Sequence, residues 1–299
     1  MENALTLDKV SKSFGDVIAV DALSAAIPQG CIYGFLGPNG AGKTTTIRMI
    51  MSILYPDSGC ISVLGNTNPE AVKDRLGYLP EEKGLYKKMK VIDLITYFGR
   101  LKGLPARSAR PEALELLNRW GLGNWADKKC DALSKGMGQK VQIISTLLHD
   151  PELVILDEPF SGLDPVNVDV VRDVVLQMKR DGKTVIFSTH IMSQAEQMCD
   201  YIMLVNGGQK LLDGSLAEVK QSGDKSIIID YDGPGNVFQG LPGVTSVNDA
   251  GKQVELSLAD DADPQEILAR LIGKVTIRRF DMSEPSLHEI FIRTVGGAS

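Results

Sequence analysis

A glycine-rich loop constrains the fold of this chain more than any other feature. Residues 37–45 read GPNGAGKTT, fit the pattern G-x-x-x-x-G-K-[ST], and follow the apolar run 31–36. A strand, a glycine loop and a helix in this order let backbone N–H groups surround the phosphates of a nucleotide. We therefore expect an α/β fold with a nucleotide held by this phosphate loop, which consists of Gly37, Pro38, Asn39, Gly40, Ala41, Gly42, Lys43, Thr44 and Thr45.

Two side chains of the phosphate loop carry the chemistry that the pattern predicts. Lys43 is placed to reach the β- and γ-phosphates, and the Thr44 hydroxyl is placed to bind Mg²⁺. The plain alternative is a glycine-rich turn between a strand and a helix, with a solvated lysine. That alternative is weak here because the flanking strand and helix patterns are both present. The loop alone does not say which kind of nucleotide-dependent protein this is.

Composition narrows the class of protein. The 299 residues carry a net charge of −6, so the chain has no global basic field for a nucleic-acid backbone, and we expect no nucleic-acid partner. Residues 1–6 lack the pattern of a secretion signal, and no apolar run is long enough to span a membrane. Any membrane role is therefore expected to come through a partner. The four widely spaced cysteines indicate buried thiols in a reducing compartment.

Hydrophobic patterning divides the chain into segments. Alternation over the first thirty residues predicts short antiparallel strands, whereas helical spacing from 91 to about 148 predicts a helical insert. The apolar runs 153–156 and 184–187 flank a helical pattern, which is typical of a βαβ unit with a buried parallel sheet. A polar break at 221–224 marks a domain boundary near 221, and strands and two helices are expected beyond it.

Two adjacent carboxylates, Asp157 and Glu158, follow the run 153–156. The carboxyl end of a buried strand is where α/β sheets place their ligands. Together with Thr44, Asp157 is a candidate for Mg²⁺ binding, directly or through water, and Glu158 for orienting and deprotonating an attacking water. The alternative interpretation is structural: the acidic pair caps the next helix and has no catalytic role. The phosphate loop upstream favours the catalytic reading.

Four motifs in sequence order identify a family. The phosphate loop is followed by LSKGMGQK at 133–140, LVILDEPFSGLDP at 153–165 and STH at 188–190. Over roughly residues 4–220 this order resembles the ATP-binding subunit of ABC transporters. The resemblance implies a P-loop ABC ATPase core at 1–220, with a mixed sheet, an antiparallel β subdomain and a helical subdomain at about 91–150. The ending at 280–291 resembles the accessory C-terminal domain of ABC-2 type exporter ATPases, so we expect a small α+β domain at 221–299.

The resemblance also implies roles for single residues. The signature segment, here Ser134, Lys135, Gly136 and Met137, binds the γ-phosphate of ATP held by the opposite subunit of a head-to-tail dimer. The dimer loop, which passes between the two sites, is formed by Ser161, Gly162, Leu163 and Asp164. By the same resemblance, we expect His190 to contact the γ-phosphate and Phe14 to stack on the adenine. Taken singly, each of these residues also fits an ordinary structural role.

Three positions depart from the family pattern. Lys135 and Met137 stand where the most common signature has glycine and glutamine, and Glu81 stands where the family usually has glutamine. Glutamate accepts a hydrogen bond from a metal-bound water but cannot donate as an amide does, so Glu81 is a candidate Mg²⁺ or water contact. Without further evidence, the nearby lysines are expected to form a solvated face; they stand at 83, 87, 88 and 90. In this family the same region faces the membrane subunit.

The resemblance implies an ATPase that binds ATP and Mg²⁺ and powers an exporter of the sodium or drug kind. It would act as a homodimer or heterodimer on integral membrane permease subunits, in the cytoplasm at the inner face of the cell membrane. One alternative is a soluble ABC ATPase acting on ribosomes or DNA, which stable co-purification with ribosomes would reveal. Another is a nucleotide-gated interaction module with weak hydrolysis, motivated by Glu81 and the altered signature; ATPase assays with the membrane partner separate it from the first reading.

Overall fold

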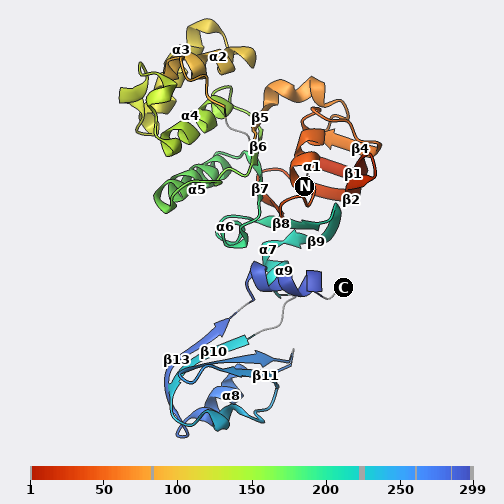
Figure 1. The fold of residues 1–299 in the computed structure, drawn as a ribbon, viewed down its shortest axis with the longest axis vertical. Coiled ribbons are helices and arrows are strands. Elements are labelled where there is room, and N and C mark those ends of the chain that lie inside the picture. Colours follow the sequence, from red (N-terminus) through yellow and green to blue (C-terminus); the bar gives the residue numbers. More distant parts are fainter. Residues whose placement is uncertain (1, 82–83, 222–225, 260, 284, 297–299) are drawn as a thin grey trace. The chain divides into compact units, whose positions relative to one another are not determined.

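The computed structural model describes residues 2–81, 84–221, 226–259, 261–283 and 285–296 (Figure 1). The chain separates into two compact units, Met1–Gly214 and Ser215–Ser299. The sequence pattern places the boundary slightly later, near 221. The difference arises because helix α7 (Leu216–Gln221) groups with the second unit.

Two sheets form the framework of the first unit. One is antiparallel, in the order β2-β1-β4, and the other has six strands in the order β5-β6-β7-β3-β8-β9. Neighbouring strands from β5 to β8 in the larger sheet pair in parallel. The strand bounds are β1 Asn3–Phe14, β2 Val17–Pro28, β3 Ile32–Leu36, β4 Ser58–Val63, β5 Leu76–Leu79, β6 Leu153–Asp157, β7 Thr184–Thr189, β8 Tyr201–Asn206 and β9 Gln209–Ser215.

The first two strands are longer than the sequence predicts. Instead of several short strands, β1 and β2 are two strands of 12 residues each, joined by a hairpin turn. Their register shifts at several points, and Lys9 and Ala22 adopt positive φ angles of 47° and 44°. Irregularities of this kind bend a long strand without ending it. The register shifts therefore bend the two strands, which run on to the hairpin turn at residues 15–16 and to Pro28.

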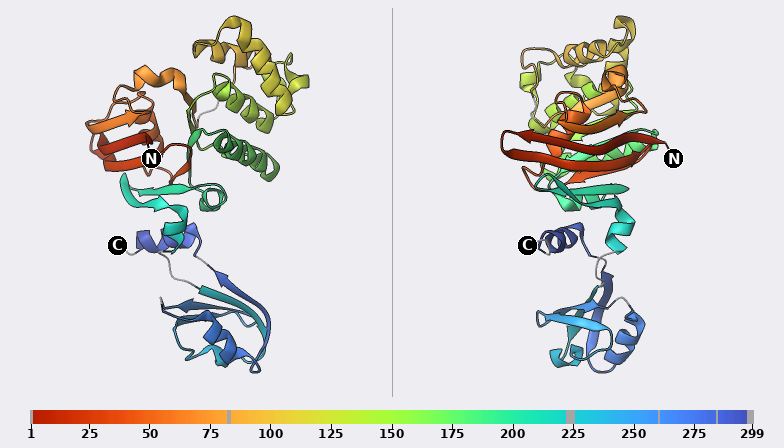
Figure 2. Two further views of the ribbon diagram at one scale, coloured as in Figure 1. Left: turned by 180° about the vertical axis from the view of Figure 1, so that it is seen from behind. Right: turned by 90° about the vertical axis from the view of Figure 1, so that its right-hand side faces the viewer.

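Helices cover both faces of the parallel strands. Residues from α1, the antiparallel sheet and the six-stranded sheet share one apolar core, whereas α4 and α5 lie on the other side of the large sheet (Figures 1 and 2). The helices of this unit are α1 Lys43–Ile50, α2 Val91–Leu101, α3 Ala106–Arg119, α4 Lys135–Leu147, α5 Pro165–Arg180 and α6 Met192–Glu196. Short 3₁₀ turns span Pro69–Arg75, Gly123–Trp125 and Cys130–Ala132.

Helices α2, α3 and α4 have a core of their own. It contains Ile92, Leu94 and Ile95 of α2, packed against side chains of α3 and α4. This core is distinct from the one around α1. A separate core supports our proposal of a helical subdomain at about 91–150.

The second unit is a small α+β fold. Its antiparallel sheet has the order β11-β12-β10-β13, and α8 packs into its core. The elements are α7 Leu216–Gln221, β10 Ser226–Asp232, a 3₁₀ turn at Gly235–Phe238, β11 Val244–Asp249, β12 Gln253–Leu258, α8 Pro264–Leu271, β13 Thr276–Ser283 and α9 Leu287–Gly296. In the parts of both units that are described, no helix is long and apolar enough to cross a membrane.

Three of the four cysteines lie in apolar interiors, and one does not. Cys31, Cys130 and Cys199 are buried, and burial raises the pKa of the Cys31 thiol to about 11. Cys60 is exposed, so the prediction of buried thiols is wrong at this position. On β4, Ile61 and Val63 supply the buried face, which leaves Cys60 on the other side of the strand.

Candidate functional site

The ends of three parallel strands bring the motif residues together. Strand β7 lies between β6 and β3, and in the register of the sheet Leu36 pairs with Thr189 and Asp157 pairs with Ser188. All residues of these strands are buried. Because the strands are parallel, the segments that follow them emerge at one edge of the sheet. The phosphate loop, the acidic pair and His190 therefore meet at that edge.

Close backbone approaches shape the phosphate loop. A Cβ atom at Gly37 would lie 2.2 Å from the carbonyl oxygen of Val205, and one at Gly42 would lie 2.4 Å from that of Ala19. Gly42 also has a φ of 102° and precedes α1 without a side-chain cap. Glycine is the residue that fits both positions. The uncapped N-terminus of α1 leaves N–H groups available to an anion.

Lys43 is held inside the loop. Its side chain is 6% exposed, and Nζ donates to the carbonyl oxygens of Gly37 at 2.7 Å and Pro38 at 3.1 Å. The same ammonium lies 3.6 Å from Oε1 of Glu158. A buried cation placed between loop carbonyls and a carboxylate is suited to an anionic ligand such as a phosphate group.

Asp157 is fully buried among hydroxyl groups. Its Oδ1 accepts hydrogen bonds from Ser188 Oγ at 2.6 Å and from Thr44 Oγ1 at 3.2 Å. Within the described residues, Oδ2 is buried and has no hydrogen-bond partner. Burial raises the pKa of this carboxyl above its usual value, against the opposing effect of the two hydroxyl donors. A buried carboxylate oxygen beside a threonine hydroxyl fits the oxygen ligands that Mg²⁺ prefers.

Glu158 is fixed by contacts to both its backbone and its carboxylate. The backbone N–H donates to Ser188 Oγ at 2.9 Å, and His190 Nδ1 lies 3.1 Å from each carboxylate oxygen, to which it donates. The residue is 6% exposed and has a φ of 46°, in the left-handed region that disfavours a glutamate. The strained backbone turns this carboxylate toward Lys43 and the phosphate loop.

An open pocket lies over the phosphate loop. Its lining comprises Ala19, residues 39–45, Glu81 and Glu158. Glu81 is therefore near the loop, on its own exposed segment after β5. Phe14 is not among the lining residues. It is half exposed at the end of the β1–β2 hairpin, where the Lys12 ammonium lies 5.7 Å from the ring centroid.

The signature segment lies away from this pocket, at the N-terminus of α4. Ser134 is the N-cap and accepts a hydrogen bond from the Met137 N–H at 3.3 Å, and both Ser134 and Lys135 are exposed. Gly136 is buried against α5, where an added Cβ would lie 2.4 Å from the side chain of Asn167. The structure thus separates the signature segment from the phosphate loop of the same chain.

The dimer loop follows Glu158 and leads into α5. Asp164 caps this helix by accepting from the Asn167 backbone N–H at 3.1 Å. Gly162 has a φ of 68°, and an added Cβ would lie 2.1 Å from Lys135 Nζ. The dimer loop and the signature segment are therefore in contact within one chain.

Two polar residues at the site were not predicted from the sequence. Ser188 joins Asp157 to the Glu158 backbone, and the buried Gln139 donates through Nε2 to the carbonyl oxygen of Pro159 at 2.9 Å. Ser188 belongs to the STH motif, so its position beside His190 was a usable signal. Gln139 lies in the motif at 133–140, but its bond to Pro159 had no local signal, because a single glutamine in a helical pattern is usually solvated.

Comparison with known proteins locates the family of each unit. A family model described as ABC transporter matches residues 20–161, and one described as the C-terminal domain of the ATP-binding protein DrrA1-3-like matches residues 214–295. A third model, described as an AAA domain, putative AbiEii toxin of a Type IV TA system, matches residues 130–193. The first two models together touch both units of the chain.

Relatives match over almost the entire length. The chain is 45% identical over 293 residues to the uncharacterized ABC transporter ATP-binding protein YhaQ of Bacillus subtilis strain 168, covering 98% of each chain. It is 33% identical over 304 residues to the Nod factor export ATP-binding protein I of Rhizobium sp. strain N33, covering 98% of this chain and 97% of the relative. A solved structure described as the ATP-binding subunit of an ABC transporter superposes with a TM-score of 0.67 at 28% identity, covering 73% of this chain and 92% of that one.

Proposed function

This chain belongs to the ABC transporter ATP-binding proteins, a family of ATPases that power transport, and we propose that it is the ATP-hydrolysing subunit of an exporter. The family assignment rests on the relative that is 45% identical over nearly the full length. Export is supported by the relative named for Nod factor export, which is similar over both units, including the small C-terminal one. The transported substrate would be selected by the membrane subunits.

The single observation that carries the catalytic proposal is the cluster of Lys43, Glu158 and His190 at the phosphate loop. Lys43 binds the phosphate oxygens of ATP, replacing part of its contact with the loop carbonyls. Glu158, held between Lys43 and His190, orients the attacking water and takes its proton. The contact between Glu158 and His190 favours hydrolysis over a nucleotide-gated module with little turnover.

Thr44 and Asp157 would hold Mg²⁺. The fit rests on the buried Oδ2 of Asp157, which has no hydrogen-bond partner among the described residues, and on the Thr44 hydroxyl next to the other carboxylate oxygen. The bound cation would neutralise charge that develops on the phosphate oxygens. Glu81, which lines the same pocket, would contact the cation or its water as an acceptor.

Two copies of the ATPase unit would complete each site. The pocket over the phosphate loop is open and has no lining residue from the signature segment, whereas Ser134 and Lys135 are exposed elsewhere. In a head-to-tail dimer the signature segment of one subunit, Ser134 to Met137, would cover the γ-phosphate held by the other. The second subunit would be an identical chain or a related ATPase. Binding of ATP then joins the subunits, and hydrolysis releases them.

A groove on the helical side offers a docking surface for a permease. It lies between the segment after β5 and helices α2 and α4, and is lined by Leu85, Leu94, Phe98 and Leu101, among others. Tyr86 and Tyr97 are half exposed and make an edge-to-face contact with ring centroids 6.3 Å apart. Exposed aromatic and aliphatic side chains of this kind fit an apolar helix of a partner. Docking there would place the chain in the cytoplasm, at the inner face of the membrane.

Replacement of Glu158 by glutamine tests the catalytic proposal. The amide would retain the size of the side chain but could not accept the proton, so we expect turnover to fall about a hundredfold. Binding of ATP should stay within about threefold, because Lys43 and the loop are intact. Steady-state ATPase assays and binding of a fluorescent ATP analogue measure the two quantities. Near-normal turnover would remove Glu158 as the base.

A second experiment tests the partner. The chain, purified from solubilised membranes, should carry an integral membrane subunit with it. Tyr97→Asp changes an exposed residue beside the groove and should release that subunit. Tyr55→Asp changes an exposed residue away from the groove and should not release it. Salt-resistant association with ribosomes would instead favour a soluble ABC protein.

A further inference from the structure

Gln139 is a buried polar residue in the N-terminal half of α4. Its side chain is only 3% exposed, and Nε2 donates to the carbonyl oxygen of Pro159 at 2.9 Å. A buried amide in a helix is costly unless its hydrogen bonds are made. The partner here is the backbone immediately after Glu158, so the bond connects the helix of the signature segment to the proposed catalytic base.

The backbone around Glu158 is held on both sides. Ser188 Oγ accepts from the Glu158 N–H at 2.9 Å, and Gln139 donates to the carbonyl of the next residue. Between these two bonds, Glu158 has its unfavourable φ of 46°. A non-glycine residue in this region persists only when its surroundings hold it there. Loss of either bond would let the backbone relax and move the carboxylate.

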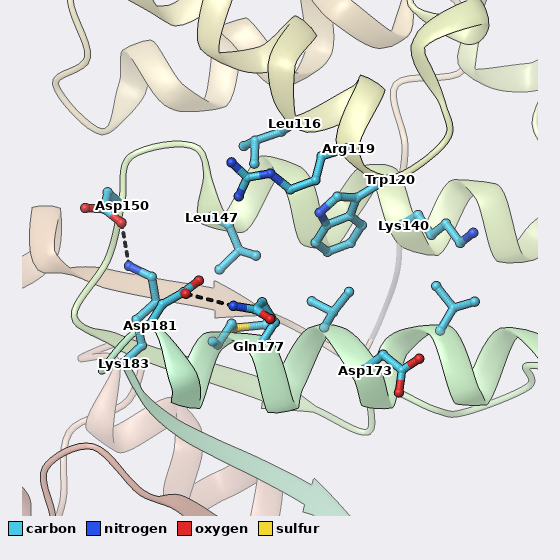
Figure 3. A pocket seen from close by; sticks show the side chains of 13 residues that line it. Leu116, Arg119, Trp120, Lys140, Leu147, Asp150, Asp173, Gln177, Asp181 and Lys183 are labelled. Carbon is cyan, nitrogen blue, oxygen red and sulfur yellow. Dashed lines mark hydrogen bonds and ion pairs between the residues drawn. The ribbon is translucent and has the colours of Figure 1, made fainter.

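The N-terminal part of α4 makes this connection. Gly136 packs on Asn167, and the Lys135 ammonium lies against Gly162, so three successive points of the helix contact the segment 159–167. Further along the helix, Lys140 and Leu147 face an open cleft that separates α4 from Val174 and Gln177 of α5 (Figure 3). The hydrogen bond from Gln139 is thus a polar link between the helix and the loop that carries Glu158.

We propose that Gln139 is a positioning residue for ATP hydrolysis: by holding the Pro159 carbonyl it keeps the Glu158 carboxylate aimed at the attacking water. This inference rests on the proposed role of Glu158 as the base. It also gives α4 a mechanical role. A movement of the signature segment, when it covers the partner's ATP, is transmitted through Gln139 to the base of the same chain.

A purely structural role makes a different prediction from a positioning role. A structural glutamine would affect stability, and its loss would lower all activities in proportion to the folded fraction. A positioning residue affects turnover but leaves ATP binding intact, and its effect depends on the presence of Glu158. Displacements of about 1 Å at a reacting group are sufficient for large losses of rate. The two roles are therefore separable by kinetics.

The test compares Gln139→Met with Ser145→Ala in the full chain. Methionine has a similar length but no donor, and we expect turnover to fall about tenfold while the apparent KM for ATP changes less than about twofold. Ser145 is a matched control, since it is a buried polar residue of the same helix whose hydroxyl donates to the carbonyl oxygen of Val141 within α4. Assayed without a membrane subunit, its alanine variant should keep the turnover of the natural chain, because the groove that Ser145 also lines is proposed for the permease and not for ATP.

A double mutant identifies the residue through which Gln139 acts. When Gln139→Met is added to Glu158→Gln, single-turnover assays should show no further loss, because no base remains to be positioned. A repeated tenfold loss in that background would overturn the proposal, as would normal turnover of Gln139→Met alone. If Gln139→Met does not fold, as judged by ATP-analogue binding, Gln139→Leu provides a second variant without a donor. If Glu158→Gln itself does not slow turnover, then Glu158 is not the base, and both that proposal and the positioning role of Gln139 are rejected.

Discussion

The phosphate-loop edge and the N-terminus of α4 both present the start of a helix, but they are built differently. At the first, Gly42 precedes α1 without a side-chain cap, and Lys43, Asp157 and Glu158 are buried around it. At the second, Ser134 caps its own helix. The phosphate-loop edge holds buried charges in place before a ligand binds. The N-terminus of α4 makes a hydrogen bond to its own Ser134 cap and remains exposed. This difference is what we expect of the two halves of a shared ATP site.

The largest expected effect is at the phosphate-loop edge. Lys43→Met removes the buried ammonium that we propose binds the phosphates, so ATP binding by the single chain should weaken by about a hundredfold and turnover should be lost. Lys90→Met, on an exposed lysine paired with Asp127, is the control and should bind ATP normally. Titration with a fluorescent ATP analogue measures both. Equal affinities of the two variants for the ATP analogue would contradict the proposed role of Lys43.

A smaller effect on binding, with a clear effect on turnover, is expected at the signature segment. Ser134→Glu places a carboxylate where the partner's γ-phosphate would lie, so turnover should fall roughly thirtyfold through charge repulsion. Binding of ATP to the single chain should change less than about twofold, because Ser134 does not line the pocket. The same two assays distinguish these outcomes.

Mixing the two variants sharpens this result. A dimer of one Lys43→Met chain and one Ser134→Glu chain contains one site in which both halves are intact. Activity of the mixture should therefore exceed that of either variant alone, if the chain forms dimers with itself. No gain in activity would contradict a shared site between identical chains.

The smallest expected effect concerns stability. The pKa of Asp157 is raised by burial, so the folded chain binds this proton more tightly than the unfolded chain. The free energy of unfolding therefore falls as pH rises from about the usual carboxyl pKa through the raised value, and at neutral pH the ionised carboxylate destabilises the nucleotide-free fold. Asp157→Asn should raise its melting temperature by about 2–4 °C. It should also abolish the extra stabilisation by Mg²⁺ and ATP; scanning calorimetry measures both, and a lower melting temperature would contradict the argument.

The sequence predicted the phosphate-loop edge in detail because each component has a local pattern. The glycines of the loop follow β3, Asp157 ends β6 and Glu158 comes next, and His190 follows β7; parallel strands end at one edge. No such rule covers Gln139. Its bond to Pro159 depends on how α4 packs against a loop 20 residues further along the chain, which is tertiary information.

The β1–β2 hairpin and Cys60 show that prediction of the fold from sequence has a similar limit. Alternation over the first thirty residues predicted antiparallel strands, but it did not reveal that bulges would let each strand bend and run for 12 residues. Burial of Cys60 was inferred from its residue type, yet strand alternation put it on the outer face of β4. Residue type alone predicts burial poorly at the edge of a core.

The left-handed backbone at Glu158 has a consequence for how this position can change in evolution. Glycine, asparagine or aspartate would occupy this position with less strain than glutamate, by about 1 kcal/mol for glycine. A duplicated copy of the gene that no longer needs hydrolysis would gain stability by the same substitution that ends its turnover. If Glu158 is the base that we propose, the requirement for turnover opposes the preference of the backbone at this position.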